Sequence, residues 1–327
     1  MKKLVALILA VMMIVAATAA LAEEKVPKIA YVPRVEGQAW WENVHKYVDM
    51  WAEEHGIEVI YKGPAEVTAE AQIPILQDMI NQGVDILCTC LNDTASGEEI
   101  LKAAREKGII VIATENEDLV NCDFDIEPHL AAEQGAFLMD LLAKQMGEEG
   151  QYITMVGSLT FESQNAWADG AVARQKEAYP KMELVPDARV EDNSDAQQAY
   201  ELTIQLKEKY PDLKGILGTG SFDAPGAARA IEEMGLTGKM FATSVAIPSE
   251  VSDFMKSGAL QGVSVWNAGI SAQAQLNAGL MLFNGEKIET GTSLGVEGYE
   301  SVVVEGNHIF GKGDVAVTPE NVDDFGF

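Results

Sequence analysis

The 327-residue chain is poor in basic residues: 23 Lys and Arg stand against 51 Asp and Glu, which gives a formal charge of −28 at pH 7. A nucleic-acid-binding protein needs a positive surface to meet phosphates, and a polybasic membrane-surface protein needs one to meet anionic lipids, so both classes are excluded. Apolar residues make up 47% of the chain, too many for a disordered acidic protein. Length and composition predict a globular protein with room for two domains, whose partners are small or positively charged.

Long apolar runs are scarce as well. The sequence has one, at positions 4–20, and it follows two lysines. This run is short for a membrane span, and Ala20-Leu21-Ala22 supplies the small residues that signal peptidase reads. We therefore predict a secretory signal over residues 1–22, cleaved between Ala22 and Glu23, and a periplasmic location. No Cys lies at the cleavage site, which argues against a lipid anchor.

Cysteine is rare, and Cys88, Cys90 and Cys122 are the whole set. The chain is therefore no disulfide scaffold. Cys88 and Cys90 share one face of a predicted strand, where a direct bridge is awkward. A bond from Cys122 to either of them and a set of buried free thiols both stay open.

Enzyme signatures are missing: the chain has no H-E-x-x-H, no G-x-S-x-G and no full G-x-G-x-x-G. The loop Gly218-Thr219-Gly220-Ser221 resembles part of a phosphate-cradling loop but lacks the third Gly and a Lys-Ser/Thr pair. Four histidines are scattered, with nothing resembling a metal or triad set beside them. We predict no enzymatic activity, no metal and no cofactor.

The chain does contain a regular alternation of short β-branched runs and helical stretches, in two series. The predicted strands are 28–34, 58–62, 85–90 and 109–114, then 151–156, 183–190, 215–219, 239–245 and 261–266. The predicted helices are 39–55, 69–82 and 96–107, then 129–146, 164–179, 195–210, 224–234, 249–257 and 270–284. Nine strands exceed what one compact sheet usually carries, so we predict an α/β protein of two Rossmann-like lobes with parallel sheets. No flexible linker separates the halves, which favours several short crossovers.

Polar and aromatic side chains follow several predicted strands, where open parallel sheets bind ligands. Arg34, Trp40 and Trp41 come after the first strand, and Glu115 follows the fourth. A guanidinium donates forked hydrogen bonds, and indole faces pack on C–H surfaces, so this set suits a polar ring compound. Trp40 also fits an apolar helical stripe, and Arg34 could pair with a surface acid, so both alternatives stay open.

The second series of strands carries a similar set of residues. Gln164 and Asn165 open a helix, where one amide could act as the N-cap. Ser221 follows a later strand, and Trp266 and Asn267 place an aromatic beside an amide at the end of another. We predict that these residues complete a ligand pocket between the lobes.

Several of these segments together resemble a known family: KIAYVPRVEGQAWWENV, IYKGPAEVTAEAQIPILQDMINQGVDILCTC, GIIVIATENE, SQNAW, GSFDAPGAARAIEEMG and VSVWNAG. They are similar to type I periplasmic sugar-binding proteins of ABC importers, in particular the branch of autoinducer-2-binding and rhamnose-binding proteins. The resemblance covers nearly the whole chain after the signal. It implies two lobes joined by three crossovers, with the ligand enclosed in the cleft by hinge closure.

The resemblance also implies contact residues. In the autoinducer-2 branch a Lys stands at the place of Arg34, an aromatic pair corresponds to Trp40 and Trp41, and an Asp is matched by Glu115. An Asp-Gln pair becomes Ser163-Gln164, Pro and Ala become Thr219 and Ser221, and an aromatic-Asp pair becomes Trp266-Asn267. These departures argue against autoinducer-2 itself and favour another small polyhydroxylated or furanose-like ligand.

The sequence thus predicts a periplasmic solute-binding component of an ABC importer, monomeric, which delivers its ligand to an inner-membrane permease. The alternative is a sensory protein that presents ligand occupancy to a receptor kinase or chemoreceptor. The expected lobes are 25–127 plus about 248–290, and 128–247 plus about 291–327.

Overall fold

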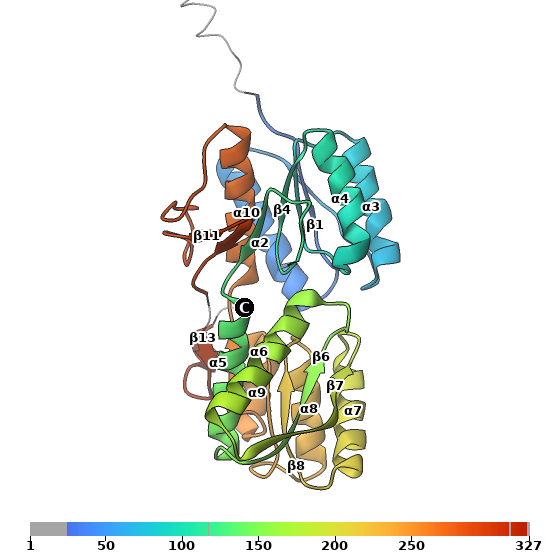
Figure 1. Ribbon diagram of the computed structural model, residues 1–327, viewed down its shortest axis with the longest axis vertical. Coiled ribbons are helices and arrows are strands. Elements are labelled where there is room, and N and C mark those ends of the chain that lie inside the picture. Colours follow the sequence, from blue (N-terminus) through green and yellow to red (C-terminus); the bar gives the residue numbers. More distant parts are fainter. Residues whose placement is uncertain (1–24, 117, 314, 326–327) are drawn as a thin grey trace, which may run out of the picture.

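The computed structural model describes residues 25–116, 118–313 and 315–325, and it arranges them in two lobes that lie one above the other in Figure 1. The predicted signal segment, 1–22, lies outside these residues. Each predicted strand and helix is present within a few residues of its expected bounds. Among the described residues, no helix is both long enough and apolar enough to cross a bilayer.

The first lobe is built on a seven-stranded sheet in the order β11-β12-β5-β4-β3-β1-β2, which is parallel except for β11. Its strands are β1 (Ile29–Val32), β2 (Val59–Tyr61), β3 (Ile86–Thr89), β4 (Ile110–Ala113), β5 (Phe124–Glu127), β11 (Val303–Glu305) and β12 (His308–Phe310). Its helices are α2 (Ala39–His55), α3 (Ala69–Asn81), α4 (Thr94–Glu106) and α10 (Ala268–Phe283). The strands are apolar on both faces because α2 and α10 pack on one face and α3 and α4 on the other.

The second lobe has a parallel four-stranded sheet in the order β7-β6-β8-β9. Its strands are β6 (Gly150–Val156), β7 (Met182–Glu191), β8 (Leu213–Gly218) and β9 (Phe241–Thr243). Its helices are α5 (Ala131–Met146), α6 (Glu162–Ala178), α7 (Ala196–Lys209), α8 (Asp223–Glu233) and α9 (Pro248–Ser257). Strand β10 (Val263–Val265) pairs antiparallel with β13 (Val315–Val317) and meets the end of β9 through a bridge between Ser264 and Val245. A short 3-10 helix, η1 (Val322–Asp324), packs against α9.

Three crossovers join the lobes, as predicted: one between β5 and α5, one between β10 and α10, and one between β12 and β13. The predicted lobe boundaries at about 248 and 291 were wrong. Helix α9 packs in the second lobe's core through Val251 and Met255, and the chain returns to the first lobe only after β10. Residues 294–302 then pack in the first lobe's core, and β11 and β12 extend its sheet. No change of composition marks residue 248, and the polar residues around 291 form an exposed loop of the first lobe rather than a crossover.

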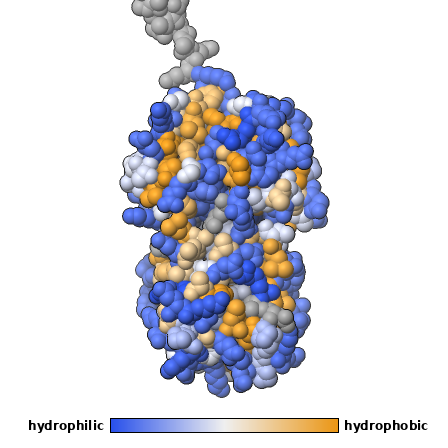
Figure 2. Space-filling view, viewed as in Figure 1, coloured by the Kyte–Doolittle hydropathy of each residue, from blue (hydrophilic) through white to orange (hydrophobic). Residues whose placement is uncertain are grey.

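The acidic surplus lies on the outside. Glu53 and Glu54 on α2 are exposed, as are Glu232 and Glu233 on α8. Hydrophilic side chains cover most of both lobes in the view of Figure 2. All three cysteines are buried and unpaired, so the structure has no bond between Cys122 and the other two.

Helices α5 and α6 touch through backbone, and glycine makes this possible. A Cβ at Gly135 would lie 2.2 Å from the Trp167 carbonyl oxygen and 2.5 Å from the Ala171 nitrogen, whereas one at Gly170 would lie 3.1 Å from the Ala132 Cα. Helix α6 carries residues of the cavity described below, so this contact sets their position.

We expect Gly135→Ala to lower the free energy of unfolding by about 1–3 kcal/mol, because the backbones must separate. Gly170→Ala is the matched control, since its looser contact lets the better helix propensity of Ala offset most of the strain. Urea denaturation of both variants measures the difference. Equal effects would contradict the close contact at Gly135.

Candidate functional site

A cavity of about 50 Å³ lies between the lobes, beyond the carboxyl ends of β1, β4, β8 and β9. Seven of the nine predicted site residues line it: Arg34, Trp40, Trp41, Glu115, Gln164, Ser221 and Trp266. It also receives residues that the sequence did not single out for this role, among them Gln38, Phe161, Trp167, Ser194 and Asp223. The strand-end expectation therefore located the cavity but not its whole lining.

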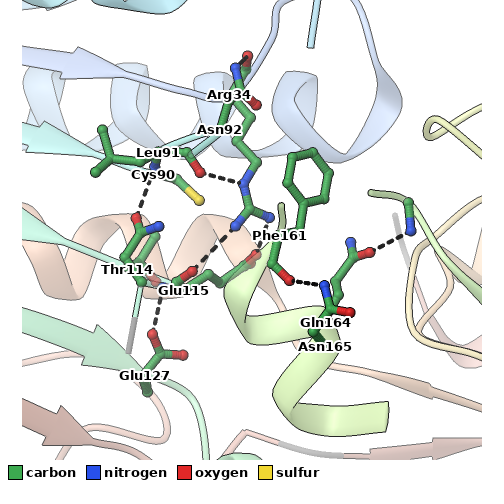
Figure 3. A network of polar contacts seen from close by, with 12 residues as sticks. Arg34, Cys90, Leu91, Asn92, Thr114, Glu115, Glu127, Phe161, Gln164 and Asn165 are labelled. Carbon is green, nitrogen blue, oxygen red and sulfur yellow. Dashed lines mark hydrogen bonds and ion pairs between the residues drawn. The ribbon is translucent and has the colours of Figure 1, made fainter. Parts of the chain in front are cut away.

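Arg34 and Glu115 form a buried ion pair at the edge of the first lobe's sheet (Figure 3). Arg34 Nη1 lies 2.7 Å from Glu115 Oε2, Nη2 donates to the Glu115 carbonyl at 3.2 Å, and Nε donates to the Leu91 carbonyl at 3.0 Å. These bonds use three of the five guanidinium N–H donors and leave two for a ligand. Glu115 Oε1 accepts no hydrogen bond from any described residue, so this oxygen is available as an acceptor.

The backbone at Glu115 is held in the left-handed region, with φ at 56°. Its N–H donates to the carboxylate of Glu127 on β5, and the Thr114 hydroxyl donates to the Ile126 carbonyl. A non-glycine residue in this region is strained and needs such support. The neighbouring strand therefore fixes the direction of the Glu115 side chain.

Six aromatic side chains among the described residues line the cavity, and they come from both lobes: Trp40, Trp41, Phe161, Trp167, Phe222 and Trp266. The Trp266 ring meets Trp40 at 5.0 Å and Trp167 at 5.4 Å, each edge to face. The Phe161 ring, from the second lobe, lies 4.4 Å from the Arg34 guanidinium carbon (Figure 3). These ring faces suit the C–H surface of a sugar ring. The cation–π contact between Phe161 and Arg34 joins the two lobes across the cleft.

Helix α6 directs two hydrogen-bonding side chains to the cavity. Gln164 Oε1 accepts from the Gly157 N–H at 2.7 Å, and its amide nitrogen has no partner among the described residues. Trp167, one helical turn later, is buried, and its indole N–H has no acceptor in the described part of the chain. An unmet buried donor is costly, so both nitrogens are suited to ligand oxygens.

Two predicted residues are not in the cavity. Asn165 Nδ2 donates to the carbonyls of Ser158 and Phe161, while its Oδ1 accepts from Arg189. Asn267 caps α10 by accepting from the N–H groups of Gly269 and Ile270. Helix geometry explains both: the residue after Gln164 faces another side, and the residue after Trp266 is an N-cap.

The glycine-rich loop after β8 is closed by the protein itself. The Thr219 and Gly220 N–H groups both donate to Asp223 Oδ2 at 2.8 Å. The side chain of Asp223, the first residue of α8, thus occupies the anion position at this helix N-terminus. A Cβ at Gly218 would lie 2.4 Å from the Asp223 Cβ, so the glycine makes room for it. The loop therefore offers no open phosphate cradle.

The lobes touch at the mouth of the cleft, so the structure is a closed form. The Thr94 hydroxyl in the first lobe donates to Glu162 Oε2 in the second at 2.7 Å, and the Thr160 hydroxyl donates to the Asn92 carbonyl at 3.3 Å. Within the described residues, no group of three or more His, Cys, Asp or Glu side chains could hold a metal ion.

Two lobes that are joined by three crossovers and enclose a polar and aromatic cavity are the architecture of a two-lobed binding protein. Residues 29–287 match the family model described as a periplasmic binding protein domain. The chain belongs to the periplasmic binding protein family.

Solved structures with the same fold include three with bound small molecules. LsrB from Clostridium saccharobutylicum in complex with AI-2 is 20% identical with a TM-score of 0.84, and the match covers 92% of this chain and 100% of that one. An ABC transporter solute-binding protein from Clostridium phytofermentas with L-rhamnose is 21% identical with a TM-score of 0.83, covering 92% and 98%. One from Agrobacterium vitis with α-D-tagatopyranose is 18% identical with a TM-score of 0.79, covering 91% and 96%. At these identities the likeness concerns the fold, which agrees with the predicted α/β architecture of two lobes.

Proposed function

We propose that the chain is the periplasmic solute-binding component of an ABC importer, which captures a small uncharged sugar or sugar-like molecule by hinge closure. The single observation that carries this proposal is the closed cavity between the lobes, with unused hydrogen-bonding atoms on Arg34, Glu115 and Gln164 and with aromatic faces around it. Hydroxyl groups both donate and accept, so a polyol can meet these atoms at once. The ligands of the similar structures named above are of the same chemical kind.

The charges of the cavity favour a neutral ligand over an acidic one. Arg34 is the one cation among its described lining residues, and Glu115 already neutralises it. A sugar acid or sugar phosphate would bring a further negative charge next to Glu115 and Asp223. Like charges at such short range in a buried site are unfavourable. The bound molecule would then be delivered by the protein, acting as a monomer, to a permease.

A titration of the purified chain from Glu23 onward with a ligand panel tests this function. The panel contains L-rhamnose, D-tagatose, D-arabinose, autoinducer-2 and D-galacturonate, followed by isothermal calorimetry and tryptophan fluorescence. We expect at least one neutral member to bind with a micromolar or lower Kd, about 8 kcal/mol or more, and to be recovered unchanged. Binding of the acidic member alone, or conversion of a ligand to product, would overturn the proposal.

We expect Gln164→Ala to raise the Kd roughly tenfold or more, because a ligand oxygen loses its donor. Asn165→Ala is the matched control: it removes the adjacent amide, which does not line the cavity and which bonds to the backbone carbonyls of Ser158 and Phe161 and to the Arg189 side chain. Calorimetry with the best ligand of the panel compares the two variants. A larger loss with Asn165→Ala would contradict the placement of these side chains.

A further inference from the structure

A pair of carboxyl groups lies buried behind the cavity wall of the second lobe. Asp192 directly follows β7, and Asp223 begins α8 and lines the cavity. Both residues have no exposed surface. Two buried acids in contact cannot both be ionised without a large cost, so the pair calls for an explanation.

In each of the two carboxyl groups, one oxygen accepts hydrogen bonds from backbone N–H groups and the other does not. Asp192 Oδ1 accepts from the Ser194 N–H at 2.9 Å, and Asp223 Oδ2 accepts from the Thr219 and Gly220 N–H groups. The remaining oxygens, Asp192 Oδ2 and Asp223 Oδ1, have no N–H or O–H donor among the described residues. The interaction that is left to these two oxygens is between the carboxyl groups of Asp192 and Asp223 themselves. Two buried carboxyl groups that meet without another donor are stable only when one of them carries a proton, which it can donate to the other.

The Asp223 side chain connects this shared proton to the ligand cavity. Its other oxygen holds the N–H groups of Thr219 and Gly220, and the next residue, Ser221, lines the cavity with them. If Asp192 lost its proton, repulsion would push the Asp223 carboxylate away from its place and would release the loop. Asp192 itself does not line the cavity and so acts through Asp223.

We infer that Asp192 is a positioning residue of the ligand cavity: the proton that it shares with Asp223 holds the 219–221 loop in the shape that binds ligand. This deepens the proposed function, but part of its test needs no ligand. Burial, followed by the charge of Asp223, raises the pKa of Asp192 to about 10. The other charged group that acts on it is Asp195, at the start of α7, while Arg34 and Glu115 lie in the first lobe's wall of the cavity.

The pH dependence of stability is the first test. The folded state keeps a proton on Asp192 that the unfolded state loses near pH 4, so this group's contribution is fully present below pH 4 and is lost as the pH rises towards 10. Asp192→Asn keeps a donor towards Asp223 and cannot ionise. We expect its unfolding equilibrium constant, relative to the wild type, to fall between pH 5 and 9 by up to tenfold per pH unit.

The matched control for this test is Asp195→Asn, which removes a nearby charge while Asn preserves the helix cap. It should follow the wild-type pH profile. A ratio of unfolding constants for Asp192→Asn that stays constant from pH 5 to 9 would overturn the inference, because Asp192 would then be ionised in the folded state.

Amide hydrogen exchange and binding are the second test. In Asp192→Ala the Thr219 and Gly220 amides should exchange at least about tenfold faster, whereas Asp192→Asn restores most of the protection. With the best ligand of the panel, Asp192→Ala should raise the Kd roughly tenfold and Asp192→Asn should raise it less. Equal exchange in all three proteins would overturn the positioning role. If no neutral ligand binds, the proposed function fails, while exchange and pH profiles still decide this inference.

Discussion

Replacing Arg34 with alanine should lower the free energy of unfolding by about 3–5 kcal/mol and abolish detectable ligand binding. Glu115 would stay buried, at 7% exposure, without the guanidinium that lies 2.7 Å away. An uncompensated charge at such a site costs far more than the lost hydrogen bonds. Urea denaturation measures the first effect, and calorimetry with the best ligand of the panel measures the second.

A surface arginine provides the control for this result. Arg105 pairs with Asp123 at 3.0 Å, but its side chain is 39% exposed, so Arg105→Ala should cost less than about 1 kcal/mol. Arg34→Lys should fall between the two, because an ammonium cannot reproduce the fork that reaches both Leu91 and Glu115. A loss of stability for Arg34→Ala as small as that for Arg105→Ala would contradict the strong coupling of this buried ion pair.

Stability and binding can be separated with a double variant. In Arg34→Met/Glu115→Leu both charges leave together, and apolar side chains of similar length fill the space. Such replacements of buried pairs are often close to neutral for stability, so most of the loss should be recovered. Ligand binding should not return, because both the donors and the acceptor are gone. Recovery of binding would remove this pair from the ligand site.

The sequence predicted the sheets well because local signals mark their strands. β3 is a run of four buried residues between a helix and a loop, and α2 ends at Gly56, whose φ of 64° suits glycine. The lobe boundaries were not predictable in this way. The chain passes from β10 to α10 within two residues, Trp266 and Asn267, and no change of composition accompanies the change of lobe.

The sequence predicted those residues of the site that follow the ends of strands. Arg34 and Glu115 each follow a buried strand of one sheet, so their meeting follows from parallel topology. Phe161 and Trp167 were missed because they reach the cavity from α6 and the segment before it, and only the closed arrangement of the lobes places them there. Trp167 could have been predicted, because it lies three residues after Gln164 and therefore on the same face of the helix. Asp192 and Asp223 lie at the end of β7 and the start of α8, far apart in the sequence, and no local pattern predicts that they interact.

A pair of carboxyl groups across the mouth of the cleft should make ligand binding depend on pH. Glu162, at the start of α6, accepts a hydrogen bond from the Thr94 hydroxyl, and its carboxyl group also interacts with Asp118. Burial, and then Asp118, raise the pKa of Glu162 in this closed form. Opening would separate the two lobes and return the pKa of Glu162 towards its usual value. Closure therefore takes up protons.

We expect the affinity for a neutral ligand to rise as the pH falls from 8 towards 4.5, because acid favours the protonated, closed form. Glu162→Gln resembles the protonated acid, so it should bind more tightly than the wild type at pH 8 and lose most of the pH dependence. Glu133→Gln is the control, since this exposed residue on α5 removes the same charge from the same lobe. Calorimetry at four pH values measures all three proteins. An affinity that falls on acidification, or a Glu162→Gln profile parallel to the wild type, would show that proton uptake at Glu162 does not accompany closure.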